Sequence, residues 1–312
     1  MIVSASRRTD IPAFFSDWFL NRLKEGFVCV RNPMRREQIS RIPLSPDVVD
    51  CIVFWTKNPI PLLDRLDALG DYPFYVHVTL TGYGHDIEPR IPDKPRELLP
   101  GIIHLADEIG PDRITWRYDP ILFSAKYTPA YHLHAFERIA SSLEGHVESV
   151  VISFVDIYVK NRRNMAACGA CDLPEQELYE FATALSRIAR SHGMDIGTCA
   201  EGIDLAACGI GHSACIDRGR IERLAGGMLD AKKDPGQRAA CRCIESVDIG
   251  TYNTCPHGCA YCYANYSPQA VKAALARYDP RSPLLCDRLL PGDVVTERHV
   301  ASLISRQETL GI

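Results

Sequence analysis

The hydrophobic pattern of this chain consists of short apolar runs that alternate with amphipathic stretches. Runs that are apolar almost throughout are typical of strands buried on both faces of a sheet. Repeated strand–helix units with right-handed crossovers build parallel sheets, so the pattern predicts an α/β protein. The predicted strands lie at residues 2–6, 27–31, 51–56, 74–81, 113–118, 149–155 and 195–200.

Two of the intervening stretches carry clear helix signals. One helix is predicted from Ser16 to a stop at Gly26. Another is predicted from Asp172, with Glu175 completing a capping box, to a stop at Gly193. The repeated units favour a closed or partly closed TIM-like (β/α) barrel over residues 1–200, and an open doubly wound sheet is the alternative.

Charged residues follow the predicted strands directly. In parallel barrels the loops at the carboxyl ends of the strands build the active site, so we expect these side chains to line one rim. An aspartate there can equally cap the next helix, but charges gathered over a barrel mouth are costly to desolvate without a use. The candidate rim residues are Arg7, Arg8, Asp10, Lys57, Arg117, Asp119, Asp156 and Glu201.

Composition and charge limit the classes of partner. The 312 residues carry a net charge of -4, which gives no overall basic field for a nucleic acid, although a local groove could still bind one. No apolar run approaches the roughly 20 residues that cross a bilayer. The arginines near the N-terminus follow the first apolar run, unlike those of a secretory signal. We expect a cytoplasmic protein without a membrane partner.

Cysteine is unusually abundant for such a protein. A reducing compartment disfavours structural disulfides, so metal or cluster ligation is the default explanation for the thirteen cysteines. Eight of them fall between Cys199 and Cys262. Cys29 and Cys51 lie in apolar strands and are predicted to be core residues.

The most specific motif is CPHGCAYC, which contains Cys255, Cys259 and Cys262. Zinc sites usually combine two cysteine pairs, but the next cysteine towards the N-terminus is Cys243, twelve residues before Cys255. Three thiolates can instead hold three irons of a cubane and leave the fourth iron open. Tyr261 precedes the last cysteine of the motif.

This loop resembles the CxxxCxYC loop of the radical S-adenosylmethionine (SAM) superfamily. Its position near the C-terminus resembles a largely uncharacterised radical SAM-like family, a domain-of-unknown-function family without a settled substrate. The likeness extends over most of the chain. The matching stretches are SASRRTDIPAF, FWTKNP, WRYDPI, VISFVD, KKDPGQR and DIGTYNTCPHGCAYCYAN.

The resemblance implies a 4Fe-4S cluster on Cys255, Cys259 and Cys262, with SAM on the open iron and Tyr261 against the adenine. Reductive cleavage would give methionine and a 5'-deoxyadenosyl radical, which abstracts hydrogen from a substrate in the barrel. An external electron donor of the flavodoxin or ferredoxin type would supply the electron. The usual glycine-glycine-glutamate segment is missing, so the rim must supply the groups that bind SAM.

We assign roles to the rim residues on this basis. Arg7, Arg8, Lys57 and Arg117 would hold the SAM carboxylate or an anionic substrate group. The candidates for the amino or ribose groups of SAM are the carboxylates of Asp10, Asp119, Asp156 and Glu201.

Four further cysteines make a second predicted site. Four thiolates close a 4Fe-4S cluster with no open iron, and the family resemblance includes these positions. A structural zinc is the alternative, and Cys208 could replace one ligand. We expect the cysteine-rich segment 201–312 to pack over the barrel mouth as one unit with the barrel. The four ligands of this auxiliary site would be Cys199, Cys215, Cys241 and Cys243.

The alternatives to a radical SAM enzyme are a non-catalytic iron-sulfur electron-transfer protein and a zinc-stabilised nucleic-acid-binding protein. DNA repair of the spore photoproduct lyase kind is a narrower option within the first class. The run YVKNRRN at 158–164 could bind phosphate, although such runs are usually solvated. His132 and His134, two apart on a predicted helix, are expected at the surface.

Overall fold

The computed structural model describes residues 1–305, in which one sheet of eight parallel strands forms the centre. The strand order is β10-β1-β4-β5-β6-β7-β8-β9, so six of the seven predicted strands lie in this sheet. The strands are β1 (Ile2–Ala5), β4 (Cys51–Thr56), β5 (Phe74–Thr79), β6 (Ile114–Ile121), β7 (Ser149–Phe154), β8 (Asp195–Cys199), β9 (Gly211–Ser213) and β10 (Val247–Asp248).

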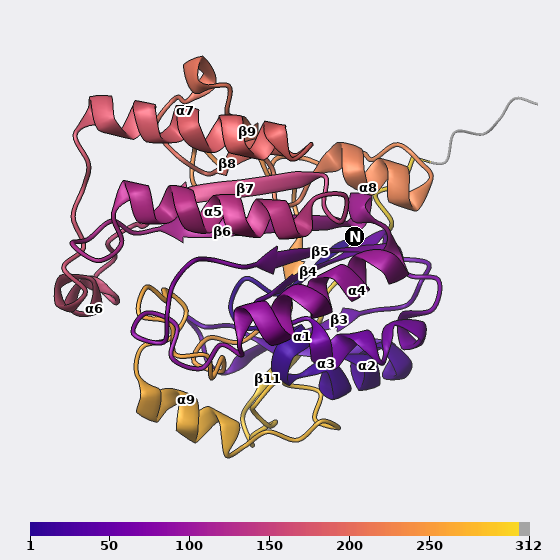
Figure 1. Cartoon of the computed structure of the whole chain (residues 1–312). Helices are drawn as coiled ribbons and strands as arrows, with labels where there is room; N and C mark the ends of the chain where they lie inside the picture. The colour runs from indigo at the N-terminus through magenta and orange to yellow at the C-terminus, as the bar shows by residue number, and fades with distance from the viewer. Residues whose placement is uncertain (306–312) are drawn as a thin grey trace, which may run out of the picture.

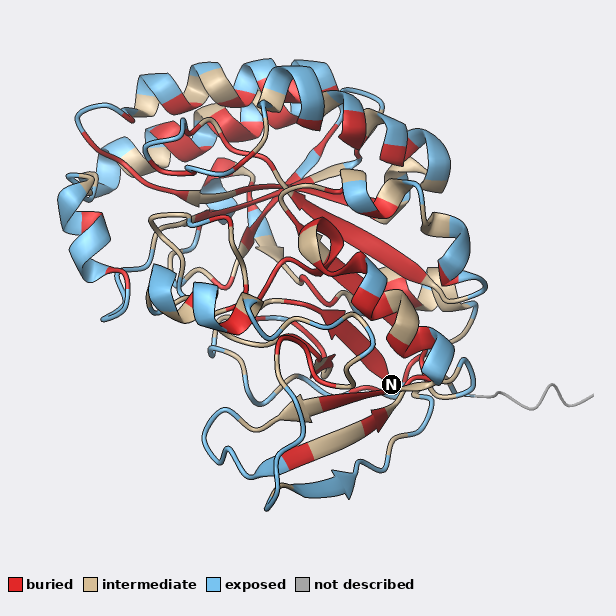
Figure 2. Ribbon diagram, turned by 90° about the horizontal axis from the view of Figure 1, so that it is seen from below, coloured by how far each residue is buried: buried red, intermediate tan, exposed pale blue. Residues whose placement is uncertain are grey.

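The predicted strand at residues 27–31 belongs to a different sheet. It forms β2 (Phe27–Arg31), which pairs antiparallel with β3 (Gln38–Pro43). The connection 32–37 is too short for the crossover of a dozen or more residues that a parallel neighbour requires. Strand β11 (Val294–Glu297) completes this three-stranded sheet and is exposed along its length (Figure 2).

Short and medium helices connect the strands. They are α1 (Ile11–Phe14), α2 (Ser16–Glu25), α3 (Ile60–Leu63), α4 (Leu99–Ile109), α5 (Pro129–Leu143), α6 (Arg162–Ala167), α7 (Glu175–Ser191), α8 (Arg218–Ala225) and α9 (Pro268–Leu275). The 3-10 turns are η1 (Leu66–Leu69), η3 (Pro111–Arg113) and η4 (Ala206–Cys208), and η2 (Lys94–Leu98) is a π-helical turn. Within residues 1–305, none of these helices combines the length and the apolarity needed to span a membrane.

The predicted ends of the helices are partly right. Gly26 adopts a left-handed conformation with φ of 75° and ends α2, as predicted. The capping box at Asp172 is wrong, because α7 begins at Glu175 and its N-cap residue is Pro174. The residue before a proline is biased towards extended backbone, and Cys171 pairs with Phe123 as an isolated bridge. Residues 171–174 are therefore held outside the helix.

The two faces of the sheet are covered by different parts of the chain. Val76 and Val78 of β5 point into the larger apolar cluster, which contains residues of α2, α4, α5 and α7. In Figure 1, α4 and α5 lie in front of the strands. Tyr75 lies on the other face in a second cluster, with Ile216 and Ile221 from the segment after residue 200.

The crossover helices thus gather on one face, and the C-terminal segment covers the other. Strands β9 and β10 of that segment also lie at the two edges of the same sheet as the strands of residues 1–200. The edges β9 and β10 do not pair with each other within the described residues, so the sheet does not close there. The architecture is a mixed α/β fold with a parallel sheet flanked by helices.

One of the two histidines expected at the surface is in the core. His132 on α5 is fully buried, with Nδ1 2.8 Å from the Tyr118 hydroxyl and Nε2 2.9 Å from the Leu122 carbonyl oxygen. His134 is exposed, as predicted. Residues two apart on a helix face different sides, so His132 faces the sheet while His134 faces outward.

The buried histidine predicts a pH dependence of stability. Burial lowers the pKa of His132 to about 4. The unfolded chain binds a proton at this residue below about pH 6.5, so stability falls as the pH drops from there towards 4. We expect a contribution of about 3 kcal/mol to be lost across this window. The free energy of unfolding, measured with urea, should depend less steeply on pH in His132→Gln than in wild type. Equal slopes, or the same effect in His134→Gln, would contradict this assignment.

Candidate functional site

One large cavity of about 510 Å³ lies at the carboxyl ends of the parallel strands. Its wall combines residues that end or follow β1, β4, β6, β7 and β8 with residues from the segment after residue 200. Of the thirteen cysteines, all within the described residues, the seven predicted metal ligands line it. They are Cys199, Cys215, Cys241, Cys243, Cys255, Cys259 and Cys262.

The four cysteines predicted for the auxiliary site lie in contact. The sulfurs of Cys199 and Cys215 are 3.2 Å apart, and Cys243 lies in hydrogen-bond contact with both Cys215 and Cys241. The contact with Cys243 lowers the pKa of Cys241 to about 7. Cys208 is not part of this group, because its thiol donates to the Tyr179 carbonyl at 3.4 Å in the main core.

Positive charge and an amide group face these sulfurs. Arg117 donates from Nη1 to the sulfur of Cys215 at 2.9 Å and is also paired with Asp119. Asp119 in turn accepts a hydrogen bond from Ser153. The backbone N–H of Ile216 donates to the sulfur of Cys243 at 3.3 Å. These donors act to lower the pKa of the sulfurs that they contact, but hydrogen bonds among the cysteines together with burial leave the pKa values of Cys215 and Cys243 raised.

Arg117 and Asp119 reach the cavity because of the local geometry of β6. They are two residues apart and therefore lie on the same face of the strand. The register to β7 shifts between Tyr118 and Ile121. Such irregularities are common next to active sites, where they re-aim side chains.

Residues 255–262, which we call the cluster loop, follow β10 and cross the ends of the first strands. The N–H of Ala260 donates to the Ile87 carbonyl at 2.9 Å, which fixes the loop against the segment after β5. Burial raises the pKa of Cys259 to about 12. This thiol stays protonated at neutral pH unless a metal cation displaces the proton.

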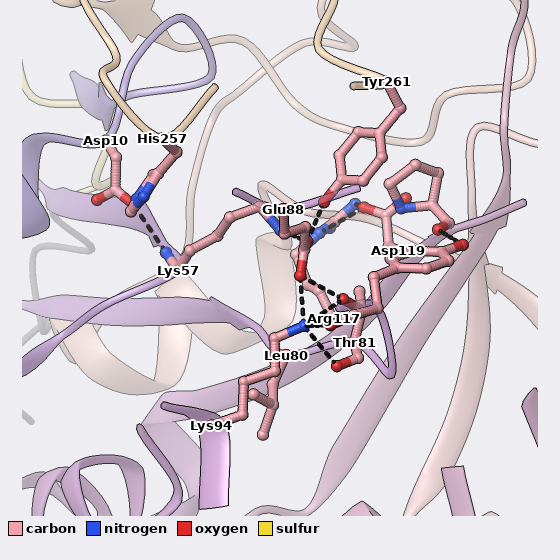
Figure 3. Close-up of polar contacts among 12 residues, drawn as sticks. Asp10, Lys57, Leu80, Thr81, Glu88, Lys94, Arg117, Asp119, His257 and Tyr261 are labelled. Carbon is pink, nitrogen blue, oxygen red and sulfur yellow. Dashed lines mark hydrogen bonds and ion pairs between the residues drawn. The ribbon is translucent and has the colours of Figure 1, made fainter. Parts of the chain in front are cut away.

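Asp10 ties three loops of the site together. Its Oδ1 accepts the N–H of Ala13 at 3.0 Å, so it caps α1. Its Oδ2 accepts the N–H of Lys57 at 2.8 Å and lies 2.8 Å from Nε2 of His257 in the cluster loop (Figure 3). The capping interpretation of Asp10 is confirmed, and the same carboxylate also anchors the cluster loop.

One buried carboxylate of the site, Glu88, is not among the residues predicted from the sequence. It is 1% exposed and lies 2.8 Å from Nζ of Lys57, with Lys94 and the Tyr261 hydroxyl also bonded to it (Figure 3). Thr81 donates to the same carboxylate at 2.9 Å. Burial acts to raise the pKa of Glu88, but the two ammonium groups outweigh it and hold the pKa well below its usual range.

Glu88 gave no signal in the sequence because it stands in an irregular loop, nine residues after the last residue of β5. Only the folded chain brings it to Lys57 and Tyr261. The Tyr261 hydroxyl is engaged by Glu88, and its ring forms part of the cavity wall.

The two arginines after β1 also line the cavity. Arg7 lies 3.6 Å from Asp234 and 3.9 Å from Asp248, and Arg8 lies 3.8 Å from Asp248. Both side chains are partly exposed, so these ion pairs leave donors that face the cavity.

The two remaining predicted carboxylates lie in different places. Asp156 lines the cavity and pairs with Arg238 at 2.5 Å. Glu201 does not line it, and its carboxylate accepts the N–H of Phe154 at 2.9 Å instead. Burial raises the pKa of Glu201. The structure therefore brings together all predicted site residues except Glu201.

The cysteines are close but do not form a ready-made single-ion site. Among residues 1–305, no group of three or more histidine, cysteine, aspartate or glutamate side chains is arranged to hold a metal ion.

This chain is thus an α/β protein with a cysteine-rich site. Seven cysteines line one cavity at the carboxyl edge of its parallel sheet. The chain belongs to a family described as a domain of unknown function (DUF1848), whose model matches residues 2–264. That span includes the whole eight-stranded sheet and all seven cysteines. None of the curated proteins compared with the chain matches it.

Proposed function

We propose that this protein is a radical SAM enzyme with a second, auxiliary iron-sulfur cluster, acting on a substrate that binds in the cavity. The observation that carries the proposal is that Cys255, Cys259 and Cys262 line the same cavity as the four contacting cysteines. We interpret the parallel sheet as a partial (β/α) barrel, in which this edge is the usual place of the active site.

The donor set of the loop fits a 4Fe-4S cluster. Three thiols stand within eight residues, and backbone N–H groups of His257 and Ala264 donate to Cys255 and Cys262, respectively. Hydrogen bonds to sulfur are one way by which proteins tune such clusters. When bound, the cluster supplies the electron for reductive cleavage of the SAM sulfonium.

The chain itself binds, orients and shields the reactants. A cavity of about 510 Å³ is within the size range of small-molecule sites. Glu88 fixes Lys57 and Tyr261 in the wall, and we propose that Arg7 and Arg8 hold a carboxylate of SAM or substrate. Trp55, Phe154 and Val155 add apolar lining that excludes water.

The predicted carboxylates fall into two groups. Some position other protein groups, and others are candidates for contact with a ligand. Asp10 and Asp119 are bonded to protein donors and are only 6% and 16% exposed, so we assign them to positioning the cluster loop and Arg117. Asp156 is the most open carboxylate of the cavity wall, and we propose it for an amino or ribose group. Glu201 would act indirectly by fixing the backbone at Phe154.

The auxiliary site gives a prediction of its own. In a Cys215→Ala/Cys243→Ala variant we expect the iron content to fall from about eight to about four atoms per chain. The iron that remains should still respond to SAM. Iron, zinc and acid-labile sulfide measured on anaerobically purified protein check this. Loss of zinc, with iron unchanged, would assign a structural zinc to these four cysteines.

Two other functions compete with this one. An electron-transfer protein without catalysis has no need of a cavity whose wall carries five basic side chains, Arg7, Arg8, Lys57, Arg117 and Arg238. A zinc-stabilised nucleic-acid-binding protein is disfavoured by the net charge of -4 and by the spacing of Cys255 and Cys259, because zinc sites usually combine two cysteine pairs. We propose a cytoplasmic location, where the thiols stay reduced, and an external one-electron donor.

The proposal is tested by its products. Reconstituted protein, incubated anaerobically with dithionite and SAM, should form methionine and 5'-deoxyadenosine, which mass spectrometry quantifies. Absence of both products from protein that carries an intact cluster would overturn the proposal.

A further inference from the structure

The segment that follows β7 packs against the cluster loop. Asn161 donates from Nδ2 to the Tyr261 carbonyl oxygen at 3.2 Å, and Asn164 donates to the Ala260 carbonyl oxygen at 3.1 Å. Met165, at the end of this segment, is fully buried in a cluster that includes Ala260 and Tyr261. Residues 157–164, which we call the 157–164 surface, are thus fixed directly on the loop.

The side chains of this surface are apolar in part and basic in part. Ile157 and Val159 are 51% and 84% exposed. Lys160, Arg162 and Arg163 are exposed, and none of the three has a carboxylate within 4 Å among residues 1–305. Three unpaired cations beside two exposed aliphatic side chains form a local positive surface on a chain of net charge -4.

This composition favours a protein partner over a nucleic acid. Lys160 already lies over the rings of Tyr266, at 4.1 Å, and Tyr252, at 5.3 Å. Lys160 therefore covers one face of each of these rings, which reduces the aromatic surface that is open for stacking on bases. An apolar centre with a charged rim is the usual anatomy of a protein–protein interface.

We propose that the 157–164 surface docks an acidic one-electron donor protein of the flavodoxin type, which reduces the cluster at Cys255, Cys259 and Cys262. This inference rests on the proposed function. In the step, the donor loses one electron and the cluster gains it, while no covalent bond or proton changes place. The positive side chains steer the acidic partner, and the contacts of Asn161 and Asn164 keep the docked face next to the loop.

The test compares two charge-reversed variants of the cluster-loaded protein. The first is Lys160→Glu/Arg162→Glu/Arg163→Glu, and the matched control is Lys24→Glu/Arg35→Glu/Arg36→Glu, at three exposed positions away from the loop. Binding of a purified acidic flavodoxin is measured by calorimetry at low and high salt. Reduction of the cluster is followed by absorbance, once with reduced flavodoxin and once with dithionite.

We expect the first variant to bind flavodoxin at least about tenfold more weakly at low salt, and to be reduced correspondingly more slowly by it. Added salt should remove most of the difference from wild type. Dithionite should reduce wild type and both variants alike, and the control should match wild type in binding.

Equal weakening in both variants, or no weakening in the first, would overturn the docking assignment. Tighter binding of a single-stranded oligonucleotide than of flavodoxin, lost in the first variant, would assign the surface to nucleic acid instead. Failure of the proposed function looks different, since protein whose cluster is reduced by dithionite would then form no 5'-deoxyadenosine from SAM, in wild type and in both variants alike.

Discussion

Replacing Cys255, Cys259 or Cys262 with alanine is expected to reduce SAM cleavage at least about 100-fold, because loss of an outer-shell partner alone can cost 10–100-fold. The three residues share one short loop and one cavity, and no other cysteine of the loop can substitute for them. The rate of 5'-deoxyadenosine formation, measured anaerobically with dithionite, checks this. The loop-bound iron should be lost together with the activity.

The matched control for this prediction is Cys171→Ala. Cys171 is exposed and does not line the cavity, so its removal should leave iron content and SAM cleavage at wild-type levels. Loop variants that keep their activity, or a Cys171 variant that loses it, would show that the reaction does not depend on the cluster loop.

Replacing Glu88 with glutamine is expected to lower the free energy of unfolding by about 3–5 kcal/mol, which is typical when one partner of a buried ion pair is removed. Lys57 and Lys94 both point their ammonium groups at this carboxylate, and the variant would leave them without their counter-charge. Urea unfolding of the metal-free protein, followed by circular dichroism, gives the value.

Two companion variants make this test specific. Glu97→Gln, at an exposed position nearby, should change the stability by no more than about 0.5 kcal/mol. The double variant Glu88→Gln/Lys94→Met also removes one of the two ammonium groups that Glu88→Gln leaves without a counter-charge. It should therefore be less destabilised than Glu88→Gln alone. A loss below about 1 kcal/mol in Glu88→Gln would contradict the importance of this network.

The pH dependence of the Glu88 effect has a defined sign. The neighbouring ammonium groups hold the pKa of Glu88 below its value in the unfolded chain. Its contribution to stability is therefore present above the unfolded value, near pH 4.3, and is lost as the pH falls through the folded value. The difference between wild type and Glu88→Gln should accordingly be largest near neutral pH and shrink in acid.

The sequence was sufficient for much of the sheet because buried parallel strands read as continuous apolar runs. The run at 51–56 became β4 in the centre of the sheet. The run at 27–31 looked the same and was assigned wrongly, since hydrophobicity does not identify the partner of a strand. Strands β9 and β10 are only three and two residues long, too short to give any periodic signal.

The part of the site that could be predicted is the part whose residues lie close together in the sequence. Cys255, Cys259 and Cys262 are close in sequence, so their proximity needed no knowledge of the fold. The grouping of Cys199 with Cys215 came from the family resemblance, and the structure places their sulfurs 3.2 Å apart.

Contacts that depend on the fold were not predictable. The bond from Arg117 to the sulfur of Cys215 joins residues 98 positions apart in the chain. The bond from Tyr261 to Glu88 joins residues 173 positions apart. No local pattern records such distances, and an isolated glutamate in a loop usually means a solvated side chain.

The most direct test of the central claim is electron paramagnetic resonance of anaerobically purified, dithionite-reduced protein with and without SAM. The triple variant Cys255→Ala/Cys259→Ala/Cys262→Ala serves as the comparison. We predict a 4Fe-4S signal that SAM perturbs and that the triple variant lacks, while a second signal from the auxiliary site remains. A spectrum without an iron signal, or one that SAM leaves unchanged, would contradict the assignment of the loop as a SAM-binding cluster site.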